Sequence, residues 1–272
     1  MYDVMVIGSG PAGLSAAVNV RQRGGSVVCV GTAKENNPLW KAERIDNYLG
    51  MPALTGAQMM EAFIAHAQAA GVEMKKERVL NAFYTGDHWM MSAGADVLEA
   101  RAVVFAGGIS RGKTWPGEEE YVGRGVSYCS TCDGMLYRGK DVAVIGYGSA
   151  DKEEAEYLEQ IGCRVEYREK PKKVTIIGEK KVSAVEVDSE TIPCECAFIL
   201  RPSLAPSSLF PGIELDGNYL KVDGDMATNL PGLYAAGDCT GRPLQVARAV
   251  GQGLVAGQKA MEWAVNARNK EN

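Results

Sequence analysis

Two strand–glycine–helix units restrict the folds that this chain can adopt. The apolar run Val4–Ile7 ends at a G-x-G-x-x-G motif, Gly8–Gly13, and is followed by a helical pattern over Leu14–Gln22 and a second apolar run over Ser26–Val30. A later apolar run, Val142–Ile145, also leads into a G-x-G turn and a helical pattern. A glycine motif inside a βαβ unit is typical of dinucleotide-binding folds. The sequence therefore predicts an α/β fold with two dinucleotide-binding-type (Rossmann-like) domains.

The second of these domains is expected to be small and inserted into the first. Its later strands must be compressed into Lys173–Ile199, and the strand expected at Gly232–Ala236 pairs more sensibly with the first unit. We therefore predict a discontinuous first domain, residues 1–111 and 201–272, around an inserted domain of residues 112–200. The hydrophobic periodicity predicts further elements. These are helices at Thr55–Ala70, Ala150–Gln160 and Ala247–Ala267, and strands at Ala102–Ala106 and Arg164–Tyr167.

Composition and charge exclude several classes of protein. The 272 residues are 46% apolar and 23% charged, which is ordinary for a globular protein. The formal net charge of −5 gives no electrostatic basis for nucleic-acid binding. No apolar run approaches the roughly 18 residues of a membrane span, and the first residues do not resemble a signal peptide. We expect a soluble, cytoplasmic protein that has neither a membrane nor a nucleic-acid partner.

The first glycine motif has the properties of a pyrophosphate site. Gly8 permits the tight turn, Gly10 lets the backbone approach a ligand, and Gly13 lets the helix pack closely. Pro11 and Ala12 complete the motif at the helix N-terminus, where backbone N–H groups and the helix dipole attract a phosphate. These five residues are the predicted cofactor-binding loop.

A C-x-x-C-D segment carries the redox chemistry expected of the chain. Cys129 and Cys132 have the spacing of a redox dithiol, and the adjacent Asp133 can transfer a proton. Cys194 and Cys196 are expected to face one side of a strand, but C-x-C is poor zinc spacing and no histidine is near, so we predict no metal site. The remaining cysteines are predicted to be small buried hydrophobic residues. They are Cys29, Cys163 and Cys239.

The segment that ends the late strand resembles the second flavin signature of flavoproteins with two dinucleotide domains. That segment is Ala235–Asp238, and a long helix follows it. The resemblance implies that Asp238, after Gly237, accepts a hydrogen bond from a ribityl hydroxyl of FAD. The N-terminus of the following helix would then stabilise the reduced, anionic flavin. FAD is therefore the expected cofactor.

Together, the glycine motif, the C-S-T-C-D segment and the G-D-C-T-G-R-P-L-Q segment at Gly237–Gln245 resemble the low-molecular-weight thioredoxin reductases. The resemblance implies that Cys132 faces the flavin, that Cys129 attacks the thioredoxin disulfide and that Asp133 is the acid and base. It also implies further cofactor contacts at the adenosine ribose and at the isoalloxazine. These contacts are Gly31 and Thr32 at the ribose, and Asn47, Gln245 and Val246 at the flavin.

The inserted domain departs from the pattern of NADPH-dependent members. Its glycine loop carries Asp151 at the sixth position, where a carboxylate would repel a pyrophosphate, and Glu169 stands where a cation should read the 2′-phosphate. The domain is also short. A degenerate but working NAD(P)H site is the alternative, because Arg168, Lys172 and Lys173 retain positive charge.

A shortened member that does not use pyridine nucleotides is the ferredoxin-dependent flavin thioredoxin reductase, which this chain resembles most. The resemblance implies that ferredoxin gives electrons to FAD, which passes them through the Cys129–Cys132 pair to thioredoxin. Ferredoxin supplies one electron at a time, whereas a disulfide takes two. A flavin can accept two single electrons in succession and so connect the two reactions. Two alternatives remain: an NAD(P)H-dependent thioredoxin reductase with atypical motifs, and a flavin and dithiol redox sensor without turnover. By analogy with the family, the chain is expected to be a homodimer.

Overall fold

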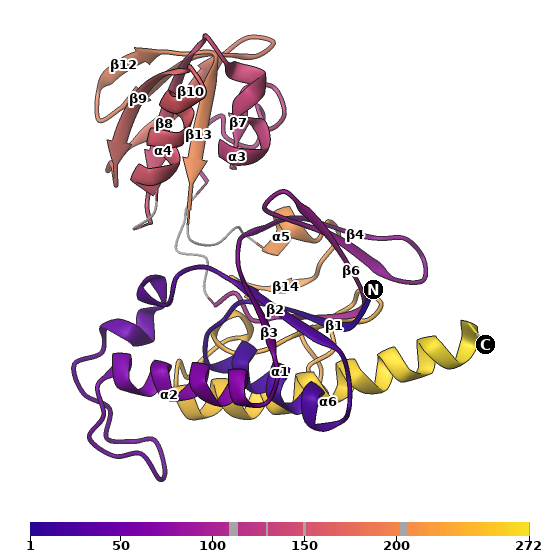
Figure 1. The fold of residues 1–272 in the computed structure, drawn as a ribbon. Helices are drawn as coiled ribbons and strands as arrows, with labels where there is room; N and C mark the ends of the chain where they lie inside the picture. Colours follow the sequence, from indigo (N-terminus) through magenta and orange to yellow (C-terminus); the bar gives the residue numbers. More distant parts are fainter. Residues whose placement is uncertain (109–113, 129, 149–150, 202–205, 272) are drawn as a thin grey trace. The chain divides into compact units, whose positions relative to one another are not determined.

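The computed structural model describes residues 1–108, 114–128, 130–148, 151–201 and 206–271 (Figure 1). The chain divides into two compact units, which are described separately. Unit 1 consists of Met1–Ser110 and Ser203–Asn272, and unit 2 of Arg111–Pro202. Among the described residues, no helix combines the length and the apolar character needed to cross a bilayer.

Unit 1 is built on a mainly parallel sheet in the order β3-β2-β1-β6. Strand β16 continues the parallel pairing along the end of β6, while β5 and β4 add an antiparallel meander to its start. The two-stranded β14–β15 ribbon is separate from this sheet. The strands are β1 Tyr2–Ile7, β2 Val27–Gly31, β3 Glu73–Lys76, β4 Val79–Tyr84, β5 Trp89–Ala93, β6 Asp96–Phe105, β14 Leu215–Asp216, β15 Tyr219–Leu220 and β16 Leu233–Ala235.

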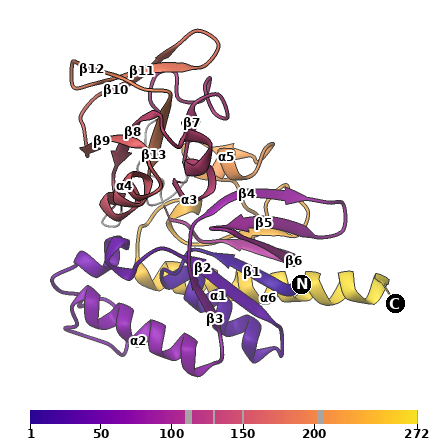
Figure 2. The ribbon, with the colours of Figure 1, turned by 45° about the horizontal axis from the view of Figure 1, so that its top comes forward.

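Three helices of unit 1 cover one face of this sheet, namely α1 (Pro11–Gln22), α2 (Gly56–Ala69) and α6 (Val246–Glu271) (Figures 1 and 2). Alternate residues of β1 point to opposite faces, so Val4 and Val6 pack beneath α1 and α6, while Met5 and Ile7 join a second core with β5 and α5. Both faces are buried, which explains why residues 4–7 of β1 are all apolar. The helices are α1 Pro11–Gln22, α2 Gly56–Ala69, α5 Pro206–Leu209 and α6 Val246–Glu271, with 3₁₀ turns η1 Lys34–Asn36, η2 Pro38–Lys41 and η4 Asp238–Thr240.

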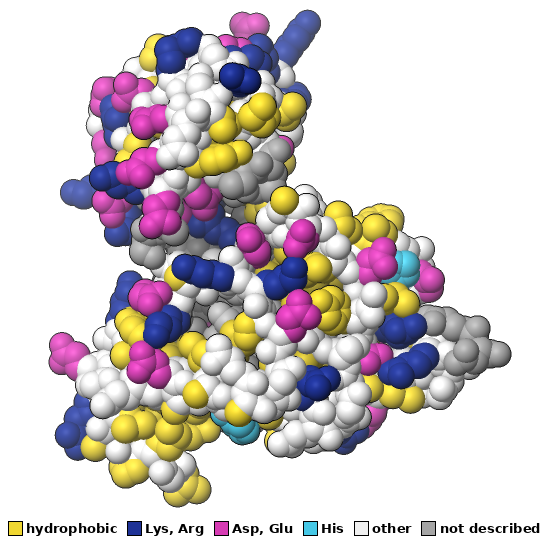
Figure 3. Space-filling view, in the orientation of Figure 1, with side chains coloured by type: hydrophobic (Ala, Val, Ile, Leu, Met, Phe, Trp, Pro, Cys, Tyr) yellow, Lys and Arg dark blue, Asp and Glu magenta, His cyan; other side chains and the backbone are white. Residues whose placement is uncertain are grey.

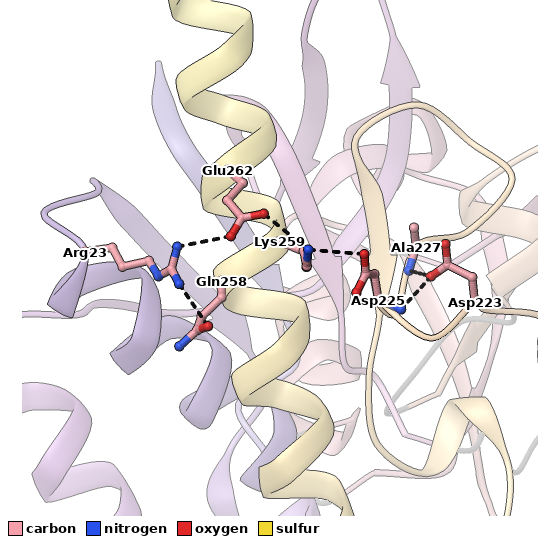
Figure 4. A network of polar contacts seen from close by, with 7 residues as sticks. All are labelled: Arg23, Asp223, Asp225, Ala227, Gln258, Lys259 and Glu262. Atoms are coloured by element: carbon pink, nitrogen blue, oxygen red, sulfur yellow. Dashed lines mark hydrogen bonds and ion pairs between the residues drawn. The ribbon is translucent and has the colours of Figure 1, made fainter.

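Polar contacts join the end of α1 to the middle of α6 (Figure 4). Arg23, just after α1, contacts Glu262 of α6 at 3.2 Å and donates to Gln258 at 2.9 Å. Lys259 extends the network to Asp225 at 3.1 Å, on the loop before β16. Because these groups are partly exposed, each pair stabilises the fold by only a fraction of a kcal/mol, about 0.2–1. They connect α6 to the end of α1 and to the loop before β16.

Unit 2 contains a four-stranded parallel sheet in the order β7-β13-β8-β9 and a three-stranded antiparallel sheet, β10-β11-β12. Helix α4 packs on β8 and β9. The strands are β7 Val126–Ser127, β8 Asp141–Gly146, β9 Arg164–Glu169, β10 Val174–Gly178, β11 Val182–Val187, β12 Glu190–Pro193 and β13 Cys196–Leu200. The helical elements are α3 Ser130–Asp133, η3 Gly134–Tyr137 and α4 Asp151–Gln160.

The predicted fold class is confirmed: two dinucleotide-binding-type domains are present, and the smaller one is inserted into the larger one. The strand expected at Gly232–Ala236 pairs with β6 of unit 1, as predicted. The sequence analysis did not predict the β4–β5 meander, whose short strands expose residues such as Phe83. One prediction is wrong: Cys194 and Cys196 pack into different core clusters. Cys194 lies before β13 begins, so strand alternation does not relate the two residues.

Candidate functional site

The first glycine loop is a tight turn at the carboxyl end of β1. Gly8 has a φ of +112°, and a Cβ there would lie 2.3 Å from the Ala106 carbonyl oxygen. A Cβ on Gly13 would lie 1.8 Å from the Gly8 carbonyl oxygen, so α1 packs directly against the turn. Only glycine is compatible with these two positions. The loop therefore brings the N-terminus of α1 onto the edge of the sheet, as the motif predicted.

The N-terminus of α1 has the chemistry of an anion site. Gly10 is the N-cap and has no side chain to satisfy the first-turn N–H groups, and no acidic residue lies in that turn. These N–H groups, including those of Ala12 and Gly13, are left for a ligand. The exposed positive end of the helix dipole adds to the attraction for a phosphate. The residues present therefore fit a dinucleotide pyrophosphate.

The end of β2 lies against this loop. A Cβ on Gly31 would lie 2.3 Å from Ser9 Oγ, so the absence of a side chain permits the close approach. Ser9 Oγ lies 3.5 Å from the Thr32 carbonyl oxygen, at the limit of a hydrogen bond. Gly31 and Thr32, the residues predicted to contact the ribose, are thus next to the predicted pyrophosphate loop.

The late segment reaches the same loop from the other end of the chain. Strand β16 runs beside β6 and leads into Gly237, whose Cβ would lie 2.9 Å from Ala12 Cβ. Gln252 of α6 holds the turn, because its Oε1 accepts hydrogen bonds at 3.0 Å from the Gly237 N–H and from Thr240 Oγ1. Asp238 begins η4 at this turn. The fold therefore brings the two predicted cofactor motifs together.

A third predicted contact region is joined to the late segment by a side-chain hydrogen bond. Asn47 Nδ2 donates to Gln245 Oε1 at 2.8 Å, across 198 positions of sequence. Both side chains are exposed, and Val246 is the first residue of α6. Two of the three residues predicted to contact the isoalloxazine thus lie side by side, with their amide groups at the surface of unit 1.

Sequence reasoning missed two residues that shape this region. Arg248 Nη1 donates to the Gly241 carbonyl at 2.6 Å, and Gln252 holds the Gly237 turn as described above. The two lie four positions apart on α6, so they share one helix face. That spacing in the first turns of the helix after Asp238 was the signal available in the sequence.

The redox segment lies in unit 2, and the structure describes it in part. Cys129 and the side chain of Cys132 lie outside the described residues. Asp133 accepts a hydrogen bond from Ser127 Oγ at 2.7 Å, and Ser130 Oγ donates to Glu154 Oε2 at 2.6 Å. The segment around the predicted dithiol is therefore anchored to β7 and to α4.

The second glycine loop is filled by a side chain of its own helix. Asp151, at the start of α4, is fully buried, and its Oδ2 accepts hydrogen bonds from the backbone N–H of Tyr147 at 2.6 Å and of Gly148 at 2.5 Å. A Cβ on Gly146 would lie 2.9 Å from Asp151 Cβ, so the carboxylate packs directly on the loop. The sequence predicted that Asp151 would repel a phosphate. The structure adds that this carboxylate already uses loop N–H groups.

A buried ion pair lies at the same edge of the unit 2 sheet. Arg201, after β13, donates through Nη2 to Glu118 at 2.8 Å, and a second contact joins Nη1 to the other carboxylate oxygen. The Arg201 guanidinium lies over the Tyr147 ring at 5.6 Å, and Trp115 stacks on that ring. Burial, followed by the Glu118 carboxylate, raises the pKa of Tyr128. Aromatic and paired charged groups thus fill this edge.

The other cysteines of the chain are buried thiols. Burial raises the pKa of Cys29 and of Cys239 to about 12, and it also raises the pKa of Cys163. A thiol with such a pKa carries almost no thiolate at neutral pH and is a poor nucleophile. The prediction that these three are small buried hydrophobic residues is confirmed.

Comparison with known proteins identifies the family. The model for the pyridine nucleotide-disulphide oxidoreductases matches residues 2–191 and 165–253. The chain belongs to this family. A ferredoxin-flavin thioredoxin reductase structure from Clostridium acetobutylicum is 37% identical and has a TM-score of 0.93, with 100% of this chain and 99% of the other covered. A thioredoxin reductase structure from Gloeobacter violaceus is 28% identical, with a TM-score of 0.84 and coverages of 98% and 95%.

A further relative with a similar sequence is also a thioredoxin reductase. The thioredoxin reductase of Listeria monocytogenes is 29% identical over 97% of this chain and 94% of its own length. The protein is thus a flavoprotein disulfide reductase of the thioredoxin reductase type. Members of its family bind FAD, and FAD is the cofactor of this reductase.

Proposed function

We propose that the reductase passes electrons from reduced ferredoxin, through FAD and the Cys129–Cys132 pair, to thioredoxin. The observation that carries the choice of ferredoxin is the Asp151 carboxylate on the second glycine loop. A dinucleotide at that loop would have to displace Asp151 from the N–H groups of Tyr147 and Gly148. It would also have to bring phosphates next to a buried negative charge, which is costly in a region of low dielectric constant.

Two cations near this loop, Arg168 and Lys170, are paired with carboxylates of the chain itself. Arg168 Nη1 contacts Glu166 at 3.0 Å, and its Nη2 contacts Glu190 at 3.2 Å. Glu169 pairs with Lys170 at 2.7 Å. A 2′-phosphate would therefore compete with existing ion pairs for the one arginine at the end of β9. The similarity to a ferredoxin-flavin thioredoxin reductase supports the same choice of donor.

Within this proposal the two units have separate tasks. Unit 1 is the FAD-binding domain, in which the Gly8–Gly13 loop holds the pyrophosphate, Gly31 and Thr32 contact the ribose, and Asp238 holds the ribityl chain. Asn47, Gln245 and Val246 contact the isoalloxazine. Unit 2 is the redox domain that carries Cys129, Cys132 and Asp133. Bound FAD supplies a centre that takes up electrons singly and releases them as a pair.

The proposed exchange with thioredoxin conserves atoms and electrons. The Cys129 thiolate attacks one sulfur of the thioredoxin disulfide, which forms a mixed disulfide and releases the other thioredoxin sulfur. The Cys132 thiol loses its proton and attacks Cys129, which forms the Cys129–Cys132 disulfide and releases the second thioredoxin thiol. Asp133 transfers the proton, and the 2.7 Å hydrogen bond from Ser127 fixes its carboxylate. Two reduced ferredoxins, each giving one electron, and two protons from solvent then return the pair to the dithiol.

Exposed apolar side chains support protein partners on both units. On unit 2, Met135 and Leu136 directly follow the C-x-x-C-D segment and are 56% and 69% exposed, so they offer an apolar contact for thioredoxin beside the dithiol. On unit 1, the loop before α2 gathers apolar side chains at the surface (Figure 3), and Leu49 in it is 98% exposed. We assign this loop to the contact between subunits of a homodimer that works in the cytoplasm.

The decisive experiment compares electron donors anaerobically. Millimolar NADPH or NADH should leave the flavin oxidised over minutes, whereas reduced ferredoxin should bleach it and drive thioredoxin reduction. The rate with ferredoxin should fall as salt is added, because docking is electrostatic. Rapid bleaching by either nucleotide at micromolar concentration would instead establish an NAD(P)H-dependent enzyme. Flavin reduction without any thioredoxin turnover would indicate a redox sensor.

The two cysteines should be separable by their variants. Cys132→Ser should lose any charge-transfer band between the flavin and a thiolate, whereas Cys129→Ser should retain that band. Both variants should lose thioredoxin reduction while the donor still reduces the flavin. Cys163→Ser is the matched control, because that thiol is buried and a serine hydroxyl can donate to the same Tyr137 carbonyl, and it should stay active. Normal turnover by Cys129→Ser would refute the assigned roles.

A further inference from the structure

We infer that Asn37 is an additional FAD-binding residue, whose side-chain amide donates a hydrogen bond to the pyrophosphate at the first glycine loop. The inference rests on the proposal that this loop holds FAD. Asn37 lies between η1 and η2, on the segment after β2, and is half-buried. It belongs to none of the motifs that predicted the site.

The orientation of the Asn37 amide is set by its own backbone neighbourhood. Its Oδ1 accepts a hydrogen bond from the Leu39 N–H at 2.9 Å and so caps η2. Because the oxygen is used in this way, the NH₂ group must point away from η2. This group donates no hydrogen bond to the part of the chain that the structure describes. It is therefore an oriented donor that is available to a ligand.

The available donor faces the N-terminus of α1. Asn37 Nδ2 lies 2.8 Å from the position that a Cβ on Gly10 would take, which is closer than real Cβ contacts allow. Gly10 is the N-cap of α1, so a group bound to the first-turn N–H groups lies beside it. The absence of a side chain at Gly10 thus admits both the cofactor and the Asn37 amide.

The loop also lacks one donor at this point. Pro11 is the first residue of α1 and has no N–H, so the backbone next to Gly10 offers one donor fewer than other helix N-termini. The pyrophosphate carries two negative charges and many acceptor oxygens. A side-chain N–H from Asn37 supplies a donor on the side where the backbone lacks one.

Two substitutions distinguish a ligand contact from a purely structural cap. Aspartate at position 37 keeps the acceptor for the Leu39 N–H, and Asn and Asp are about equally good caps. It replaces the NH₂ donor by a negatively charged oxygen that faces the phosphates. Asn37→Ser also keeps an acceptor, but its shorter side chain removes the NH₂ group that reaches Gly10, without adding charge. Asn81→Asp, an exposed change on β4 of the same unit, controls for the added charge.

The measurement is the dissociation constant of FAD, from the fluorescence recovered when the holoenzyme is diluted, with ADP and adenosine as competitors. Asn37→Asp should weaken FAD and ADP by about 30-fold or more, and Asn37→Ser by about three- to tenfold, because a hydrogen bond to a charged group is lost. Adenosine, which has no phosphate, should compete equally well in all variants. The apoprotein of Asn37→Asp should unfold at the same temperature as the parent, and Asn81→Asp should change nothing.

Unchanged FAD and ADP binding by Asn37→Asp would overturn the inference, and so would an equal loss of adenosine binding. The Gly10→Glu variant, measured in parallel, distinguishes an error in the role of Asn37 from an error in the proposed FAD site. If Gly10→Glu loses FAD while Asn37→Asp binds it normally, only the role of Asn37 is wrong. If Gly10→Glu also keeps full affinity, the loop is not the FAD site.

Discussion

The two glycine loops of the reductase follow equivalent parallel strands but differ in the charge of the helix that comes next. After β1, the first turn of α1 has no acidic residue and its N-cap has no side chain. After β8, the first turn of α4 contains three carboxylates, and that of Asp151 accepts hydrogen bonds from two loop N–H groups. The first loop keeps its donors for a ligand, whereas the second uses them within the chain.

This difference shows how a glycine loop of a dinucleotide-binding-type fold can have its N–H groups satisfied by the chain itself. A helix N-terminus leaves unpaired N–H groups that must be satisfied by a ligand, by water or by a side chain. In unit 2 the Asp151 side chain accepts hydrogen bonds from such N–H groups, and its negative charge also complements the helix dipole. The strand, turn and helix of this unit are therefore held together by a side chain of the chain itself. The predictions below test this contrast.

The largest effect is expected at the first loop. Gly10→Glu should weaken FAD binding by about 100-fold or more, because it adds bulk and negative charge where we propose that the pyrophosphate binds. The purified variant should be colourless, which absorbance in the visible range measures directly. Gly224→Glu adds the same side chain at an open position of unit 1 and should stay yellow. Full flavin content in Gly10→Glu would contradict the claim that the first loop keeps its N–H donors for a ligand.

A smaller effect, on stability rather than on FAD, is expected at the second loop. Asp151→Ala removes the acceptor of the Gly148 N–H, while the Tyr147 N–H keeps its second acceptor, the Leu200 carbonyl at 3.0 Å. The variant should therefore lower the free energy of unfolding by about 1–3 kcal/mol. Chemical denaturation of the holoenzyme measures this change. Glu153→Ala removes an exposed carboxylate from the same helical turn and should change stability by less than about 0.5 kcal/mol. Equal stability of Asp151→Ala and the parent would show that the loop does not need its carboxylate.

The close contact between β2 and the first loop should have a more modest influence. Gly31→Ala places a methyl group against Ser9, so the loop must shift and FAD should bind about tenfold more weakly. Fluorescence titration with FAD gives the dissociation constant. Gly251→Ala adds the same methyl group to α6 where nothing lies within 4 Å, and it should bind FAD normally. Unchanged affinity in Gly31→Ala would mean that FAD binding does not depend on the close contact between Gly31 and Ser9.

The smallest effect is expected at the buried thiols. Burial raises the pKa of Cys29, Cys194 and Cys239 to about 12, so each stays protonated as the pH rises from 7 to 9. Iodoacetamide should therefore leave them unmodified over this range in the reduced, folded protein, and only the C-x-x-C pair should react. Mass spectrometry of the alkylated peptides checks this result. Unfolding should expose all three, and rapid modification of Cys29 in the native state would contradict its burial.

Local sequence patterns determined the elements that lie within one stretch of chain. The apolar run before Gly8 and the helical pattern after it predicted β1 and α1, because strand and helix periodicity depend only on neighbouring residues. The same reasoning located β8 and α4, and it identified Asp151 as unfavourable for a phosphate. The β4–β5 meander was missed, because its exposed apolar side chains, such as Phe83, weaken the alternation that indicates a strand.

The tertiary structure alone decided which distant residues meet. Asn47 bonds to Gln245 and Gly237 packs on Ala12 because β16 pairs in parallel with β6, a contact between segments more than a hundred positions apart. The sequence marked Asp151 by its charge, but only the folded turn shows that its carboxylate reaches the N–H groups of its own loop. Charge and periodicity are local properties of a sequence, whereas the partner of each polar group depends on how the strands are ordered in the sheet.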